Sequence, residues 1–514
     1  MNTVTISHGK LAGSEVDGIN SFKGIPYAAP ISGENRWLPP KPPESWSGTR
    51  DATQYGNVVP QQPSPPMWIA GPAGKKFLEV IDVTGPQGDD CLNLNVWSPS
   101  LDTDAKLPVM FYIHGGAYVA GANSLPIYEG KNLAKKGVVV VSINYRFALQ
   151  GFFVAPGMFD DDFCGPNRGF EDTLAGLRWV QENIRQFGGD PDNVTIFGES
   201  AGGQSIVVMV ASPASKGLFK RAIAQSGTPE FCAPVSDHQH FAPDLLKAIG
   251  IKPGDRAAIS ALTGKDTVKA MTAARKLLAR KDAEERYGSL VINSNYGCVS
   301  GTEFMPVHLL DSIQQGTAKD IDLMIGTVAE DGRLFPLTMP GPEAFAAWYC
   351  MPMFKHLMLP RKEHKLVFER YKKAMPGVPN KYVRGQILTD CMFRRGTVRA
   401  AEMHAEASPG KTWLYQFNWS SPVAGIGSMH GIDIALCFNN LEAFELILGD
   451  LEPIRNLADT VSDVWVNFAK TGKPTANIPE WKPFDAEQRA TMIFDDKIEL
   501  HNDVDRHLRE IWYG

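Results

Sequence analysis

This chain of 514 residues has little of what marks membrane-spanning, secreted or nucleic-acid-binding proteins. Its longest candidate apolar run, at 137–143, is far shorter than the roughly 18–20 residues that cross a bilayer. The N-terminus lacks the basic start, apolar stretch and cleavage site of a signal peptide. The formal net charge is −6 and no long basic run is present. The sequence therefore predicts no membrane insertion and no nucleic-acid partner.

Cysteines are few and scattered, at Cys91, Cys164, Cys232, Cys298, Cys350, Cys391 and Cys437. Their number is odd and none forms a C-x-x-C pair, so we expect neither a metal site nor a disulfide framework. A reduced, cytoplasmic compartment fits this pattern. With 43% hydrophobic and 21% charged residues, the composition is typical of globular proteins. No cofactor is expected, and a monomer and a homodimer both stay open.

Nearly continuous apolar runs alternate with helical patterns along most of the chain. Strands are expected at 107–113, 138–145, 194–197, 221–225, 321–325 and 412–417, and a helix at 173–184. Because such strands are apolar on both faces, they predict a mainly parallel sheet that helices cover on both sides. The charged, helical stretch at about 336–410 is expected to form a cap over this sheet. No linker or repeat divides the chain, so residues 1–514 are predicted to form a single domain.

Gly198-Glu199-Ser200-Ala201-Gly202 is the only G-x-S-x-G motif of the chain. It follows the β-branched run at 194–197 and precedes a segment that can continue as a helix. Strand, sharp turn and helix are the setting of a nucleophile elbow, in which a strained turn presents the serine hydroxyl above the sheet. The motif therefore makes Ser200 a candidate nucleophile.

A serine nucleophile needs a base and an acid that orients the base. In folds with this elbow the acid follows Ser in the chain and His comes last. Glu330 and Asp331 follow the strand at 321–325, and the residues alone do not choose between them. Of the six later histidines, His430 is the best candidate because it lies between glycines in a loop after the strand at 412–417.

The negative charge that develops on an attacked carbonyl needs backbone N–H groups aimed at it. One is expected from Ala201, directly after the nucleophile. The others are expected from His114-Gly115-Gly116-Ala117-Tyr118, a glycine-rich loop after the strand at 107–113. Its small residues allow the amides to approach a bound carbonyl group.

These motifs, in this order, resemble those of the type B carboxylesterases, a family that includes bacterial and animal carboxylesterases and the cholinesterases. The matching segments are 9–13, 22–28, 90–96, 113–117, 144–146, 197–203, 224–227 and 429–431, so the resemblance covers nearly the whole chain. It implies an α/β-hydrolase fold and a serine carboxylic-ester hydrolase without a cofactor.

The resemblance also implies a role for each catalytic candidate. Ser200 would be the nucleophile, His430 the general base, and Asp331 the acid, at a position where many relatives have Glu. Glu330 keeps a small share of that role. The oxyanion donors would be the amides of Gly116, Ala117 and Ala201, with Gly115 supporting the turn.

Supporting residues follow from the same resemblance. Glu199 would lie near the histidine and Ser226 near the acid, although stabilisation of a first helical turn explains Glu199 equally well. Two structural ion pairs are implied, between Arg36 and Asp89 and between Arg146 and Asp172.

Two departures from the family narrow the expected function. Secreted relatives close a loop by a disulfide at the position of Cys91, but no cysteine precedes it here. Cholinesterases hold the quaternary ammonium of their substrate with a tryptophan in the same loop. Residues 78–84 contain no aromatic residue, and the nearest tryptophan is Trp68. A choline ester is therefore not the expected substrate.

We thus expect a cytoplasmic, bacterial serine carboxylesterase that acts on a small hydrophobic ester. The apolar substrate is inferred from the cap residues Trp348, Tyr349, Met351, Met353 and Phe354, which packing within the cap explains equally well. An amide or carbamate hydrolase with the same triad is one alternative. A catalytically inactive adhesion or scaffold homologue is another, but all three triad candidates are present.

Overall fold

The computed structural model describes residues 2–62, 71–290, 296–334 and 364–513. Its centre is a 13-stranded sheet. Across the sheet the order is β1 (Asn2–Ile6), β2 (Gly9–Val16), β3 (Ile19–Pro26), β5 (Asn93–Ser98), β7 (Val139–Ile143), β6 (Leu107–Ile113), β8 (Gly189–Glu199), β9 (Arg221–Gln225), β12 (Asp322–Val328), β13 (Thr412–Phe417), β14 (Ala490–Phe494) and β15 (Glu499–Asn502), with β4 (Thr49–Asp51) paired to β2. A separate pair joins β10 (Cys232–Pro234) to β11 (Cys298–Ser300).

The strands from β7 to β14 run parallel, and the strand pairs β1–β2, β2–β3, β3–β5, β5–β7 and β14–β15 are antiparallel. Alternate residues of β6 enter two different hydrophobic cores, Phe111 on one face of the sheet and Tyr112 on the other. This division explains why the strand has no polar face. The predicted mainly parallel sheet is confirmed.

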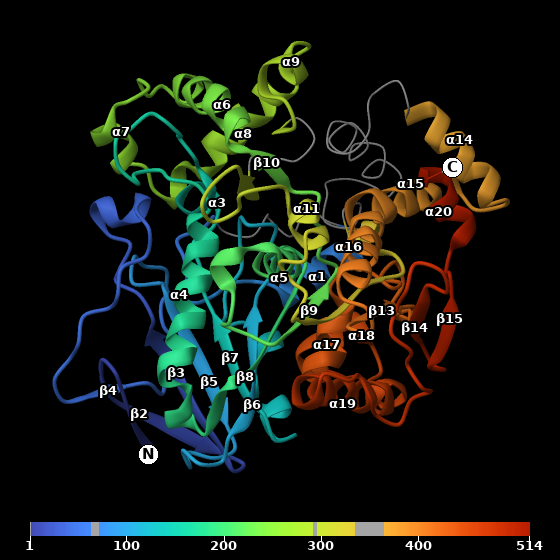
Figure 1. Cartoon of the computed structure of the whole chain (residues 1–514), viewed down its shortest axis with the longest axis horizontal. Helices are drawn as coiled ribbons and strands as arrows, with labels where there is room; N and C mark the ends of the chain where they lie inside the picture. The colour runs from blue at the N-terminus through green and yellow to red at the C-terminus, as the bar shows by residue number, and fades with distance from the viewer. Residues whose placement is uncertain (1, 63–70, 291–295, 335–363, 514) are drawn as a thin grey trace.

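Helices cover both faces. The core on the Phe111 face includes α4 (Arg168–Asn183), α5 (Ala201–Ala211) and α16 (Arg395–Ala407), and the other core includes α17 (Ile432–Phe438) and α19 (Arg455–Thr471). The remaining helices are α1 (Pro72–Val80), α2 (Lys131–Ala134), α3 (Ala148–Phe152), α6 (Val235–Ala248), α7 (Arg256–Ser260), α8 (Thr267–Leu278), α9 (Ala283–Tyr287), α11 (Leu309–Gln314), α14 (His364–Ala374), α15 (Asn380–Thr389), α18 (Glu445–Leu448) and α20 (Arg506–Tyr513). Helices α6 to α9 gather at the top of Figure 1, from its left side to its centre, and α14, α15 and α20 gather at the upper right.

Most expected elements coincide with observed ones. The strands predicted at 107–113, 221–225 and 412–417 are β6, β9 and β13. The strand predicted at 321–325 is longer, because residues 326–328 continue its pairing with β13. The turn with the two candidate carboxylates is therefore shorter than expected.

The predicted cap at about 336–410 falls partly outside the described residues, which exclude 335–363 and with them the five apolar residues named above. Trp68 is excluded too. The described part is helical, but α16 packs against β12 and β13 and thus belongs to the layer that covers the sheet. The cap as a unit stays a prediction. No helix in the described ranges has the length and apolar composition that crossing a bilayer requires.

Both predicted ion pairs are confirmed. Arg36 Nη2 lies 3.0 Å from Asp89 Oδ2, and Arg146 Nη2 lies 2.7 Å from Asp172 Oδ1. The second pair is fully buried and connects the end of β7 to α4. Cys91 is a free, buried thiol.

Candidate active site

Ser200 occupies a sharp turn between β8 and α5. Its backbone has φ 59° and ψ −123°, a conformation that residues other than glycine rarely adopt. Two hydrogen bonds hold the turn: Ser200 N–H donates to the carbonyl of Gln225 at 2.9 Å, and Gln204 N–H donates to the carbonyl of Ser200 at 2.8 Å. This is the strand–turn–helix setting that the motif predicts.

Gly202 allows the turn to approach the neighbouring strand. A Cβ atom at Gly202 would lie 2.0 Å from the carbonyl oxygen of Ile113, the last residue of β6. Since the contact is with backbone, no side-chain movement relieves it. The glycine of the motif is therefore required by the packing of α5 against β6.

Asp331 and His430 are in direct contact. Asp331 Oδ1 lies 2.6 Å from His430 Nδ1, and both side chains are buried. The hydroxyl of Ser226 donates to the same Oδ1 at 2.9 Å, and Val328 N–H donates to Oδ2 at 3.2 Å. The carboxylate is thus oriented from three directions, with one of its oxygens directed at the imidazole.

Glu330, the other candidate acid, faces elsewhere. Its Oε1 lies 2.6 Å from Arg333 Nη1, and its Oε2 accepts from Ser428 N–H at 3.0 Å. A backbone hydrogen bond of 3.0 Å from Glu330 N–H to the carbonyl of Ser428 adds to this contact. Glu330 therefore joins its own turn to the loop that carries His430, and this connection brings the shorter Asp331 within reach of the imidazole.

Glu199 lies on the other side of the same imidazole. Its Oε1 is 3.2 Å from His430 Nε2, and its side chain is 5% exposed. Burial raises the pKa of Glu199. Burial lowers the pKa of His430, but the Glu199 and Asp331 carboxylates more than reverse this, so the pKa of His430 lies above its usual value. The two groups therefore influence each other's protonation.

Ser200 and His430 line the same cavity. Within the described residues no hydrogen bond joins the Ser200 hydroxyl to the imidazole, whose Nδ1 binds Asp331 and whose Nε2 lies against Glu199. Catalytic hydrogen bonds are often long in enzymes without substrate and shorten when substrate binds.

The expected oxyanion donors Gly116, Ala117 and Ala201 line this cavity as well, and so does Gly115, which is expected to support the turn. Gly116 has φ 113° and Ala117 has φ 54°, so the loop turns sharply where its amides meet the cavity. A Cβ atom at Gly116 would lie 1.9 Å from the carbonyl oxygen of Ala120. The position therefore tolerates only glycine.

The cavity has a volume of about 700 Å³, within the range of small-molecule sites. Much of its wall is apolar, formed in part by Phe77 and Leu78 of α1, by Met271 of α8 and by Ile434 of α17. No group of three His, Cys, Asp or Glu side chains in the described parts of the chain is placed to hold a metal ion.

Two contacts of the site have no signal in the sequence. The ring of Phe393 lies against His430, with ring centroids 4.5 Å apart. The side-chain amide of Gln61 donates to the carbonyl of Gly121 and accepts from its N–H, both at 2.9 Å. Both residues come from segments without a recognisable motif, so only the folded chain reveals them.

Comparison with known proteins agrees with this geometry. The sequence profile of the carboxylesterase family matches residues 1–512. The chain is 33% identical to the para-nitrobenzyl esterase of Bacillus subtilis, over 99% of this chain and 97% of that protein. It is 31% identical to a liver carboxylesterase of Sus scrofa, over 91% and 84%.

Solved structures of such esterases have the same architecture. A PNB esterase superposes with a TM-score of 0.81 at 32% identity, over 100% of this chain and 99% of that one. A carboxylesterase of Geobacillus stearothermophilus gives a TM-score of 0.81 at 32% identity, over 99% of both chains. The expected α/β-hydrolase fold is thereby confirmed. The chain belongs to the carboxylesterase family of carboxylic-ester hydrolases.

Proposed function

We propose that the protein hydrolyses apolar carboxylic esters with Ser200, His430 and Asp331 as its catalytic triad. The observation that carries this proposal is the 2.6 Å contact of Asp331 with His430 Nδ1 at a cavity that Ser200 also lines. An acid that holds Nδ1–H leaves Nε2 free to accept a proton, and this arrangement makes a base of the imidazole.

The proposed reaction has two halves. Ser200 Oγ attacks the ester carbonyl while His430 takes its proton, and the amides of Gly116, Ala117 and Ala201 stabilise the oxyanion. His430 then gives the proton to the departing alcohol, which leaves an acyl group on Ser200. A water molecule, deprotonated by His430, attacks this acyl group. His430 then returns the proton to Ser200 Oγ as the bond to the acyl group breaks, and the acid is released. In the described part of the chain, none of these three amides donates a hydrogen bond to another group.

An apolar substrate is supported by the apolar wall of the cavity. A choline ester is not, because no tryptophan stands among the described residues of that wall to hold a quaternary ammonium group. We further infer that the enzyme works in the cytoplasm of a bacterium. The scattered free cysteines and the match to a Bacillus esterase support this inference.

Hydrolysis of short-chain nitrophenyl esters by wild type and Ser200→Ala tests the proposal. We expect turnover to fall on the order of 10⁶-fold, the loss typical of a deleted serine nucleophile. An organophosphate should label the wild type once per chain and leave Ser200→Ala unlabelled. An unchanged rate in the variant would contradict the assignment, and an amide and carbamate panel measures the alternative activity. A wild type that is neither active nor labelled would indicate the inactive homologue.

A further inference from the structure

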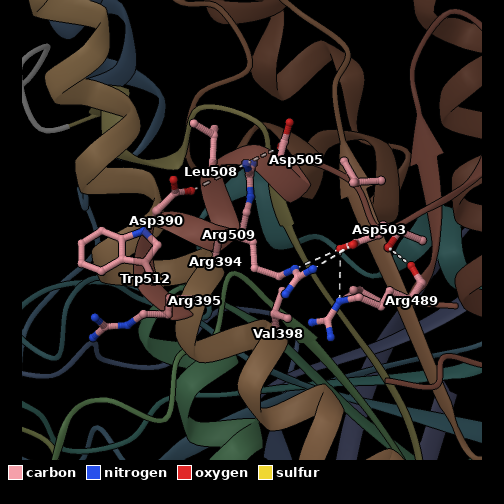
Figure 2. A pocket seen from close by; sticks show the side chains of 13 residues that line it. Asp390, Arg394, Arg395, Val398, Arg489, Asp503, Asp505, Leu508, Arg509 and Trp512 are labelled. Carbon is pink, nitrogen blue, oxygen red and sulfur yellow. Dashed lines mark hydrogen bonds and ion pairs between the residues drawn. The ribbon is translucent and has the colours of Figure 1, made fainter. Parts of the chain in front are cut away.

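A π-helical turn at Asp390–Arg394 lies between α15 and α16 and faces two cavities. Met392 and Phe393 line the cavity of Ser200. Asp390 and Arg394 line a second, charged pocket next to α20 (Figure 2). Short π-helical turns are rare and often occur at functional sites. The turn therefore connects the candidate active site to the charged pocket.

Arg394 contacts the backbone directly before the candidate acid. Its Nη2 donates to the carbonyl of Val328 at 3.2 Å and to that of Ala329 at 3.1 Å. These residues end β12 and begin the turn that carries Asp331. The Arg394 side chain is 12% exposed, so water competes little for these charge-assisted hydrogen bonds.

The other side of the guanidinium is anchored by carboxylates. Arg394 Nη1 lies 2.8 Å from Asp505 Oδ2 and 3.7 Å from Asp390 Oδ1. Figure 2 shows Arg394 between these two groups, whereas Arg509 faces Asp503. Asp390 is in turn held by the Tyr371 hydroxyl, which donates to its Oδ2 at 2.5 Å. The guanidinium thus has fixed partners on both sides.

Thr389, the last residue of α15 and directly before the π-helical turn, contacts the chain after Asp331. Gly332 N–H donates to the hydroxyl of Thr389 at 2.9 Å. Together with Arg394 before the acid and Phe393 on the ring of His430, this contact encloses the acid–base pair from three sides. The position of the short Asp331 side chain therefore depends on how this segment is held.

We propose that Arg394 is a positioning residue: by binding the carbonyls of Val328 and Ala329, it holds the turn from which Asp331 reaches His430. Arg394 touches neither substrate nor the reacting atoms, and its effect passes through the Asp331–His430 hydrogen bond. The expected loss of kcat rests on the proposed function, whereas the expected weakening of the Asp331–His430 contact does not. An aspartate has few rotatable bonds with which to follow a displaced backbone, so a small shift of the turn weakens the contact.

Replacement of Arg394 by methionine tests this proposal, with Arg509→Met as the matched control. Arg509 lines the same charged pocket and pairs with Asp503 at 2.8 Å, but it does not bind the end of β12. The first measurement is the low-field proton NMR signal of His430 Nδ1–H, identified by its loss in His430→Gln. We expect this signal to shift or broaden in Arg394→Met and to stay in place in Arg509→Met.

The second measurement is ester hydrolysis. We expect Arg394→Met to lower kcat by about ten- to a hundred-fold, the range for a small misplacement of catalytic groups. KM should change by less than about two-fold, because no contact to substrate is removed. Arg394→Lys, which keeps the charge but not the planar fork, should restore part of the loss.

The outcomes separate the two proposals. An unchanged NMR signal and unchanged kcat in a folded Arg394→Met would overturn the positioning role, as would equal losses in Arg509→Met. If Arg394→Met does not fold, Asp505→Asn removes only the carboxylate that binds Arg394 Nη1. A wild-type NMR signal and a wild-type kcat in that variant would overturn the positioning role. If the wild type does not hydrolyse esters, the proposed function fails while the NMR comparison still decides the positioning role.

Discussion

The imidazole of His430 lies between two buried carboxyl groups with different contacts. Asp331 binds Nδ1 at 2.6 Å, and Glu199 approaches Nε2 at 3.2 Å. A charged Glu199 stabilises the imidazolium, which is inactive as a base. A protonated Glu199 does not stabilise it, and burial favours this protonated form. The protonation state of Glu199 therefore changes the basicity of His430.

This pair predicts a pH dependence. His430 acts as a base only when neutral, and a raised pKa keeps it protonated to higher pH, so activity falls as the pH drops through that raised value. Glu199→Gln removes a carboxylate that raises the pKa of His430, so the acid limb of kcat/KM should move to lower pH. The control is Glu171→Gln, which alters a partly buried glutamate whose pKa is raised to about 7 by desolvation. An acid limb that stays in place in Glu199→Gln would refute the coupling.

At the scale of elements, the loop from His114 to Gly121 is held from outside the sheet. The side-chain amide of Gln61 forms two hydrogen bonds with the backbone of Gly121, and Gly121 packs against His114. Loop amides stabilise a transition state only if their direction is fixed before the reaction.

We therefore predict that Gln61→Ala lowers kcat about ten-fold, less than the loss of a whole oxyanion donor. Binding of a trifluoromethyl ketone, which forms a tetrahedral oxyanion adduct, should weaken in parallel. Gln62→Ala is the matched control, because Gln62 lines the same cavity but donates to the carbonyl of Gly264 at 3.2 Å. Equal inhibitor affinity in the two variants would show that Gln61 does not hold the loop.

The sequence predicts elements best where burial alone determines their composition. Strands β6, β9 and β13 are buried between two helical layers, so their apolar runs identify them. The choice between Glu330 and Asp331 depends on a contact with Ser428, far along the chain, and adjacent carboxylates carry no local sign of it. For the same reason neither Gln61 nor Arg394 was expected. The catalytic roles themselves stay predictions.

At the scale of the whole molecule, one buried ion pair joins three parts of the fold. Arg146 pairs with Asp172 of α4, and its Nη1 donates to the carbonyls of Asn35, Arg36 and Leu38 in the N-terminal region. Both charged side chains are fully buried, so the stability that the pair contributes depends on each charge having its partner.

Asp172→Asn should lower the free energy of unfolding by about 3–5 kcal/mol, because it leaves the buried Arg146 without its counter-charge. Urea titration followed by tryptophan fluorescence measures this loss. The control Arg256→Met removes partly exposed pairs with Glu34 and Asp161, which water screens, so its loss should be much smaller. Similar losses in the two variants would mean that burial adds nothing to the pair.

The order of the parallel strands has a consequence for the time course of folding. Ser200 follows β8, Asp331 follows β12 and His430 follows β13, and each neighbouring strand in the parallel region reaches its place by a long crossover. Contacts between such distant segments form slowly, since a large loop must close before they are made. After dilution from denaturant, helical signal should return well before ester hydrolysis does. Enzymatic activity thus reports the completion of the sheet, and a chain can be compact for some time before it is a catalyst.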